Sequence, residues 1–299
     1  MVMFGSTSDP ANDAVRQMAD DPRLLGLLTD VLASCWRRCG LPFADLPAIL
    51  AAAIADPDDA TAAAHRAAAY LRTRPGTFGT AYGNARAAKF DGFADLLGPM
   101  VRPGLICDIG AGDTQLVQRL STVNPANSKF IATDVTGSPC VDGAVSFARQ
   151  PAPDRLPLAD DSASTVIATG MLHHMTPTTR RALLSDVRRV LEHGGRLLLL
   201  EETFPAAAWT PHSELDARFQ SLDEHGRWAF LAVTDWWGNR VMKNLPNEPL
   251  PCTFMDIAEL EQVLAESGLA VGIATYLGIR AFGGHMATPR ALIVAEWTG

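Results

Sequence analysis

Two acidic residues and a glycine-rich turn are the residues of this chain whose types and spacing point most directly to ligand binding. Asp108 follows the apolar run 105–107 and opens the sequence Asp108-Ile109-Gly110-Ala111-Gly112. Glycine has no Cβ and adopts positive φ readily, so such a turn lets the backbone approach a ligand closely. Asp134 ends a second apolar run, 130–133. An acid at the tip of the second strand of a nucleotide-binding α/β unit can accept hydrogen bonds from two ribose hydroxyls.

Two adjacent histidines follow a later apolar segment. The run Ser164 to Thr169 predicts a strand, which continues as Gly170-Met171-Leu172-His173-His174. Ligands of open α/β sheets bind at the carboxyl edge of the strands, and this pair falls there. Imidazole is the side chain that most often transfers protons in catalysis. The pair is therefore a candidate for chemistry at that edge.

The elements that must position these residues alternate between strands and helices. Apolar runs and turn signals predict each of them. The predicted strands are 105–107, 130–134, 145–149, 164–169, 196–200, 269–277 and 290–297; helices follow the glycine turn up to Leu120, end near Glu192, and cover 256–267. Strands that alternate with helices predict an α/β fold with a mostly parallel sheet.

In this order the segments resemble the class I S-adenosylmethionine-dependent methyltransferases, in particular their small-molecule branch. The resemblance rests on the Asp108 turn, Leu156-Pro157-Leu158, Leu172-His173-His174 and the Gly194-Gly195 pair before the fifth strand, and covers roughly residues 78–299. Several motifs in the right order are more specific than any one alone. The resemblance implies a Rossmann-like sheet of seven strands, mostly parallel with an antiparallel last strand.

The resemblance also implies which residues hold the cofactor, S-adenosyl-L-methionine. The first acid and the glycines lie beside its methionine part, and the second-strand acid binds the ribose. Carried over by position, the cofactor-binding residues are Asp108, Gly110, Ala111, Gly112, Asp134, Asp154, Thr169, Gly170, Tyr82 and Arg86. Asp154 is equally well read as a solvated loop acid. Arg86 suits the methionine carboxylate because a guanidinium forms a bidentate pair, but a solvated arginine beside a core tyrosine is the alternative.

Methyl transfer from a sulfonium is a direct displacement, so alignment of the acceptor supplies much of the rate. A base is needed only if the acceptor must lose a proton. We expect His174 as that base and His173 as a contact on the cofactor side. The predicted function is that of an enzyme, a methyltransferase acting on O, N or C of a small molecule in secondary metabolism. The alternative is a protein of the same fold that binds S-adenosylmethionine in a non-methylating, cyclase-like or regulatory role.

Two features of the sequence depart from related patterns. The first restricts the class of cofactor, and the second changes the expected topology. A dinucleotide-binding turn would carry a third glycine where Gln115 stands, which argues against a pyrophosphate on this turn and against a nicotinamide-dependent dehydrogenase. Only a short segment with Gly137, Pro139 and Gly143 separates Asp134 from the next strand. We therefore expect the second crossover helix to be short or absent.

Composition excludes several other classes. The net charge of −8 and the lack of a basic patch argue against nucleic acid as a partner. No signal peptide and no apolar run of transmembrane length is present in the sequence, so no membrane association and a cytoplasmic location are expected. The 5 cysteines show no zinc-ligand spacing, and no metal site is predicted. A homodimer is left open.

The composition of the chain predicts two regions, an N-terminal helical one and a cofactor-binding domain. Residues 1–98 are predicted to form an N-terminal helical cap of three or four helices, broken near 40–42, 56–58 and 74–76. A winged helix domain is the competing reading, but a basic recognition helix is missing. Residues 99–299 are predicted to form the cofactor-binding domain, with an aromatic-rich insert at about 204–252. Within it Phe230, Trp236, Trp237 and the Asn239-Arg240 pair are expected to form the wall of an acceptor pocket.

Overall fold

The computed structural model of the chain describes residues 9–38, 43–73, 75–123, 127–136, 143–245, 247 and 250–299. The predicted break at 40–42, Cys39, Cys140 and the middle of the short second crossover lie outside these residues. The described chain folds into two compact units. We call residues 90–206, 255–277 and 290–299 the sheet unit, and residues 1–89, 207–254 and 278–289 the helical unit.

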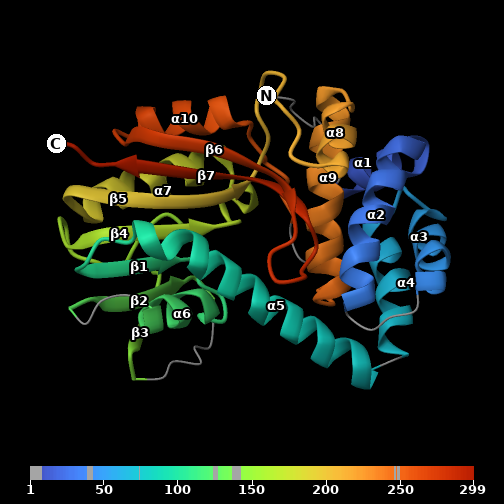
Figure 1. Cartoon of the computed structure of the whole chain (residues 1–299), viewed down its shortest axis with the longest axis horizontal. Helices are drawn as coiled ribbons and strands as arrows, with labels where there is room; N and C mark the ends of the chain where they lie inside the picture. The colour runs from blue at the N-terminus through green and yellow to red at the C-terminus, as the bar shows by residue number, and fades with distance from the viewer. Residues whose placement is uncertain are drawn as a thin grey trace. The chain divides into compact units, whose positions relative to one another are not determined.

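The sheet has seven strands in the order β3-β2-β1-β4-β5-β7-β6 (Figure 1). The strands are β1 Leu105–Ile109, β2 Lys129–Asp134, β3 Val145–Arg149, β4 Ala163–Thr169, β5 Leu191–Glu202, β6 Ala270–Arg280 and β7 Thr288–Glu296. Strands β1 to β5 pair in parallel, whereas β7 runs antiparallel to β5. This confirms the predicted α/β sheet, mostly parallel with an antiparallel last strand.

The strand order places the predicted ligand-binding residues at one edge. In the register of β1, Ile109 lies between Thr133 of β2 and Ala168 of β4. The turns that follow β1, β2 and β4 therefore start at the same level of the sheet. Because the order reverses between β1 and β4, this edge is the point where open α/β sheets bind ligands.

Helices of the sheet unit pack an apolar face against the strands. They are α6 Gln115–Val123, α7 Pro177–Val190, α10 Ile257–Glu266 and the short turns η2 Gly98–Met100 and η3 Leu172–His174. Leu183 and Val187 of α7 and Leu260 of α10 are buried in one core with Val166 and Ile293 of the strands. Each such side chain contributes about 1.5–3 kcal/mol by burial, which makes this core a rigid base for the loops at the edge.

Local signals explain where these helices begin. The Thr176 side chain caps α7 and Pro177 occupies its first turn, where a missing N–H costs nothing. Asp256 and Glu259 form a reciprocal capping box at the start of α10. The predicted helix over 256–267 is thus confirmed to within a residue at each end.

The helical unit is built from helices of the N-terminal segment and of the insert. Their bounds are α1 Pro10–Asp20, α2 Pro22–Arg38, η1 Phe43–Asp45, α3 Leu46–Ile54, α4 Ala60–Arg72, the first part of α5 Pro75–Leu97, α8 Glu214–Gln220, α9 Glu224–Trp236 and the π-helical turn η4 Trp237–Met242. Helix α1 packs against α9, and the Trp236 indole donates a 3.0 Å hydrogen bond to the Ala60 carbonyl. The insert is therefore an integral part of this unit.

Two details differ from the sequence prediction. The described chain has five α-helices between 10 and 97, because Asp21 ends α1 and Pro22 starts α2. Strand β5 begins at Leu191, so the Gly194-Gly195 pair lies inside the strand, with Gly194 at a φ of 76° beside a register shift between β4 and β5. The division at residue 98 stays a prediction. No helix among the described residues combines the length and the apolar character that a membrane crossing requires.

Candidate active site

The turn after β1 has the backbone conformation that its glycines predict. Gly110 has a φ of 63° and Gly112 a φ of 53°, both in the left-handed region that glycine enters without strain. A Cβ on Gly110 would lie 3.2 Å from Sδ of Met171, whereas a Cβ on Gly112 would meet no atom within 4 Å. Between them the amide of Ala111 donates to the Thr133 carbonyl at 3.1 Å. The turn is tied to β2 and leaves open space beside Gly112.

Asp134, at the tip of β2, holds this turn in place. Its Oδ2 accepts a 2.9 Å hydrogen bond from the Gly112 amide, and its Oδ1 accepts from the amide and hydroxyl of Thr136 at 2.9 and 3.2 Å. An ionised carboxylate has about four acceptor positions, so capacity for a further donor remains. The sequence predicted a ligand contact for this acid, and the bond to Gly112 adds a structural role.

Asp108 is a buried acid in an acidic setting. Burial, and then the charges of Asp134 and Asp113, raise the pKa of Asp108 to about 8. Such a shift means that the ionised form lacks a compensating cation in the protein itself. A positively charged group bound at this edge would supply one. Perturbed acids of this kind are found preferentially at functional sites.

Gln150 is a candidate site residue that the sequence did not single out. It directly follows β3, its amide donates to the Asp134 carbonyl at 2.9 Å, and its side chain is 6% exposed. Its buried Nε2 has no hydrogen-bond partner among the described residues. A buried donor without a partner lowers the stability of the fold by about 1–3 kcal/mol, and a hydrogen-bond acceptor on a bound ligand would remove this penalty. A polar residue at the end of a strand beside Asp134 was the signal available.

Asp154, the predicted adenine contact, lies further along the same loop. It is half-buried, in a turn closed by a 3.1 Å hydrogen bond from the Arg155 amide to the Ala152 carbonyl. Gln150 is closer to the strand end than Asp154. A cofactor role for Asp154 stays a prediction.

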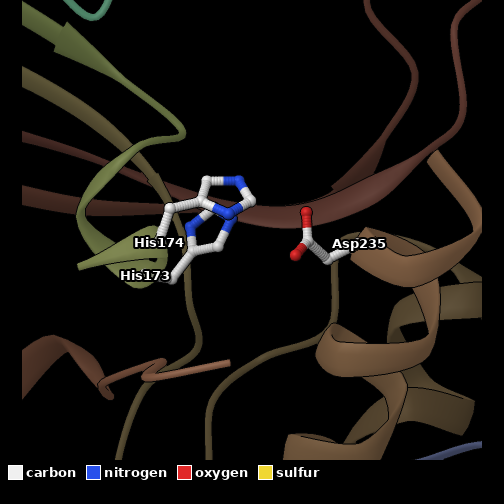
Figure 2. Close-up of side chains that lie close together, drawn as sticks. All are labelled: His173, His174 and Asp235. Atoms are coloured by element: carbon white, nitrogen blue, oxygen red, sulfur yellow. The ribbon is translucent and has the colours of Figure 1, made fainter. Parts of the chain in front are cut away.

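Thr169 and Gly170 end β4 at the same edge. Gly170 has a φ of 56°, and its amide donates to the Leu200 carbonyl of β5 at 2.9 Å. The chain then turns into η3, which carries His173 and His174. Their ring centroids lie 4.2 Å apart with planes tilted by 41°, and His173 is buried while His174 is half-buried (Figure 2). Asp235, also drawn there, belongs to α9 of the helical unit.

Tyr82 and Arg86 lie in the part of α5 that belongs to the helical unit. The Tyr82 hydroxyl is 3.3 Å from Nε2 of His285, and the two rings are 5.5 Å apart. Arg86 is half-buried. The tyrosine is thus engaged within its own unit, and the predicted cofactor contacts of both residues stay predictions.

The aromatic residues of the insert are core residues of the helical unit. The side chains of Phe230, Trp236 and Trp237 are 0% exposed. Asn239 donates to Asp235 at 2.6 Å, and Arg240 forms an ion pair with Asp9. Packing and internal bonding account for these positions, so the acceptor-pocket wall predicted for them stays a prediction.

The residues at the carboxyl edge of β1, β2 and β3 fit S-adenosylmethionine. This cofactor carries an ammonium and a sulfonium, and the chain places three acids at this edge, Asp108 of β1, Asp113 of the turn and Asp134 of β2. It has hydroxyl and ring nitrogen acceptors, and Gln150 has a buried amide donor. S-adenosylmethionine carries no phosphate group. This suits the space beside Gly112, because the acids around it would repel a phosphate. Opposite charge and unmet hydrogen-bonding capacity therefore agree with the same ligand.

Comparison with known proteins finds a family match over part of the chain. Residues 107–199 match the family model described as a methyltransferase domain. The comparison with curated protein sequences found no match. The matched segment runs from β1 into β5 and contains the glycine turn, Asp134, Gln150 and the two histidines.

Solved structures share parts of the architecture at low identity. A SAM dependent methyltransferase from Aquifex aeolicus is 14% identical, with 71% of this chain and 93% of that chain covered and a TM-score of 0.46. The 1,6-didemethyltoxoflavin-N1-methyltransferase of Burkholderia thailandensis, bound to 1,6-didemethyltoxoflavin and S-adenosylhomocysteine, is 17% identical, with 79% of this chain and 90% of that chain covered and a TM-score of 0.46. The geranyl diphosphate C-methyltransferase of Streptomyces coelicolor A3(2) is 11% identical, with 69% of this chain and 76% of that chain covered and a TM-score of 0.48. Likeness at this level says nothing about the acceptor.

Over residues 107–199 the chain matches a methyltransferase domain, and its sheet order agrees with that match. The resemblance drawn from the motifs is confirmed over these residues.

Proposed function

We propose that the protein transfers a methyl group from S-adenosylmethionine to O, N or C of a small molecule. The observation that carries this proposal is the acidic, glycine-lined turn: Asp108 is buried with a raised pKa, and Asp134 anchors Gly112 beside open space. These features suit a cationic, phosphate-free cofactor. The methyl group and the leaving sulfur come from the cofactor, and the residues of the chain supply binding and alignment.

Each predicted contact has a distinct task. Asp108, Gly110, Ala111 and Gly112 are proposed to hold the methionine part, and Asp134 the ribose. Gln150 is proposed to donate its buried amide to the cofactor, with Asp154 as the further adenine contact. Thr169 and Gly170 border the cofactor from β4. Tyr82 and Arg86 are proposed as further cofactor contacts.

One of the two imidazoles on η3 is proposed to accept the acceptor's proton where the acceptor has one to lose. General-base catalysis typically contributes about 10² to 10⁴ in rate. His173 and His174 both follow β4 at the edge that holds the cofactor turn.

The proposed acceptor is a small molecule of secondary metabolism rather than nucleic acid. A net charge of −8 disfavours approach to a phosphate backbone, which supports this choice. A cytoplasmic location and a homodimer stay predictions.

The experiment that tests the proposal is turnover with a panel of small acceptors. The purified chain is incubated with S-adenosylmethionine and each acceptor, and mass spectrometry measures S-adenosylhomocysteine and a product heavier by one methylene. Formation of both in equal amounts is expected for at least one acceptor. Methyl transfer to RNA or DNA, with none to small molecules, would contradict the proposal.

A further inference from the structure

Glu201, near the end of β5, is a buried acid with donors at both oxygens. Its Oε2 accepts from the amides of Met171 and Leu172 at 3.2 and 2.9 Å. Its Oε1 accepts from the Glu202 amide at 3.0 Å and lies 2.6 Å from Nδ1 of His173. The acid at the end of one strand thus holds the turn that follows its neighbour, β4.

These contacts keep the carboxylate ionised. Burial acts to raise the pKa of Glu201, but His173 and the backbone amides outweigh it and leave that pKa below its ordinary value. The guanidinium of Arg180 on α7 lies near the same cluster and donates to the Leu172 carbonyl at 3.4 Å. Its positive charge also favours the ionised form of Glu201.

The tautomer of a neutral His173 follows from a count of hydrogen atoms. An ionised carboxylate only accepts hydrogen bonds, so the 2.6 Å contact requires a hydrogen on Nδ1 of His173. A neutral imidazole carries one such hydrogen, and Nε2 then holds the lone pair. A carboxylate partner of this kind fixes both the tautomer and the orientation of the ring, and it stabilises the imidazolium that forms when Nε2 takes a proton.

We infer that Glu201 is a positioning residue that holds His173 in the Nδ1–H tautomer, so that Nε2 of His173 is the atom that accepts the acceptor's proton. The inference rests on the proposed function and deepens it. The proton of the acceptor's X–H bond moves to Nε2, and the electron pair left on X forms the bond to the methyl group. The cofactor's sulfur keeps the pair of the broken S–C bond. The ring of His174 packs against that of His173 with their centroids 4.2 Å apart.

The tautomer is measured on the full chain labelled with ¹⁵N-histidine. A long-range proton–nitrogen correlation spectrum distinguishes protonated from unprotonated ring nitrogens, and the spectrum of His173→Gln assigns the signals among the 7 histidines. The expected wild-type result is a protonated Nδ1 and an unprotonated Nε2 on His173. A proton on Nε2 alone would overturn the inference.

Glu201→Gln and Glu202→Gln form a matched pair. The glutamine amide at 201 can donate to Nδ1, so the proton of His173 is expected to move to Nε2. Glu202 pairs with Arg290 instead, and its variant should keep the wild-type signature. An unchanged His173 signature in a folded Glu201→Gln protein would overturn the inference. Calorimetry with S-adenosylhomocysteine distinguishes failure of the proposed function from failure of this inference. No binding by the wild type refutes the proposed function, whereas normal binding with an Nε2–H tautomer of His173 refutes the inference alone.

Discussion

The carboxylate of Asp134 accepts a 2.9 Å hydrogen bond from the amide of Gly112, which joins the tip of β2 to the turn after β1. The acid that is expected to meet the ribose is therefore also the acid that shapes the turn expected to meet the methionine part. Loss of this one side chain should affect both ends of the cofactor.

Asp134→Ala should weaken binding of S-adenosylhomocysteine about tenfold or more while the protein stays folded. Charge-assisted hydrogen bonds contribute roughly 1.5–3 kcal/mol each, and about 1.4 kcal/mol corresponds to a tenfold change in Kd. Isothermal titration calorimetry measures the change. Asp134→Asn keeps an oxygen for the Gly112 amide and should lose less affinity. Wild-type affinity in a folded Asp134→Ala protein would place the ribose elsewhere.

Gln150→Leu should have opposite effects on stability and on binding. The substitution removes a buried Nε2 without a partner among the described residues, so the free energy of unfolding without cofactor should stay level or rise by about 1 kcal/mol. The affinity for S-adenosylhomocysteine should fall, because the amide donor is lost. Urea unfolding and calorimetry are run in parallel on both proteins. Reduced stability combined with unchanged affinity would show that Gln150 serves the fold alone.

Asp108 should make the cofactor-free protein lose stability as pH rises. The folded pKa is about 8 against an ordinary value of 3.8, so between these values the folded state keeps a proton that the unfolded state has released. Folding is then disfavoured progressively from about pH 4 to about pH 8, and the effect levels off above. Asp108→Asn should flatten this part of the stability curve, measured by urea unfolding at several pH values. Parallel curves for the two proteins would show that Asp108 ionises normally.

Substitution of the two histidines should separate their roles. With an acceptor that must lose a proton, His173→Ala should lower kcat about 10²-fold or more, because it removes the imidazole that Glu201 orients. His174→Ala should cost less, and neither should change cofactor affinity strongly. The assignment of His174 as base and His173 as cofactor contact, drawn from the sequence, predicts the reverse order. Near-wild-type kcat in both variants would leave alignment as the main source of rate.

Much of the fold follows from local sequence signals. The apolar runs of β1, β2 and β4 are short and end at glycines or acids, and the capped helix α10 has one apolar face. Such patterns determine element type and order directly. The split at Asp21-Pro22 was overlooked because the apolar spacing of α1 and α2 continues on either side of it.

The site was predictable where its residues sit in a motif and not where they depend on strand order. Asp108 lies near the end of β1 and Gly110 and Gly112 lie in the turn that follows, and positive φ at both glycines agrees with their type. Gln150 and Glu201 became visible only once β3 lay beside β2 and β5 beside β4. Neither the missing partner of one nor the bond from the other to His173 can be read from spacing along the chain.

The most direct test is calorimetric titration of the wild-type chain with S-adenosylhomocysteine and, separately, with NAD. The acids around the turn and the glutamine in place of a third glycine favour a cationic, phosphate-free cofactor over a pyrophosphate. Saturable, one-to-one binding of S-adenosylhomocysteine with no response to NAD is predicted. Tight binding of NAD with no heat from S-adenosylhomocysteine would contradict the assignment of the cofactor and, with it, the proposed function.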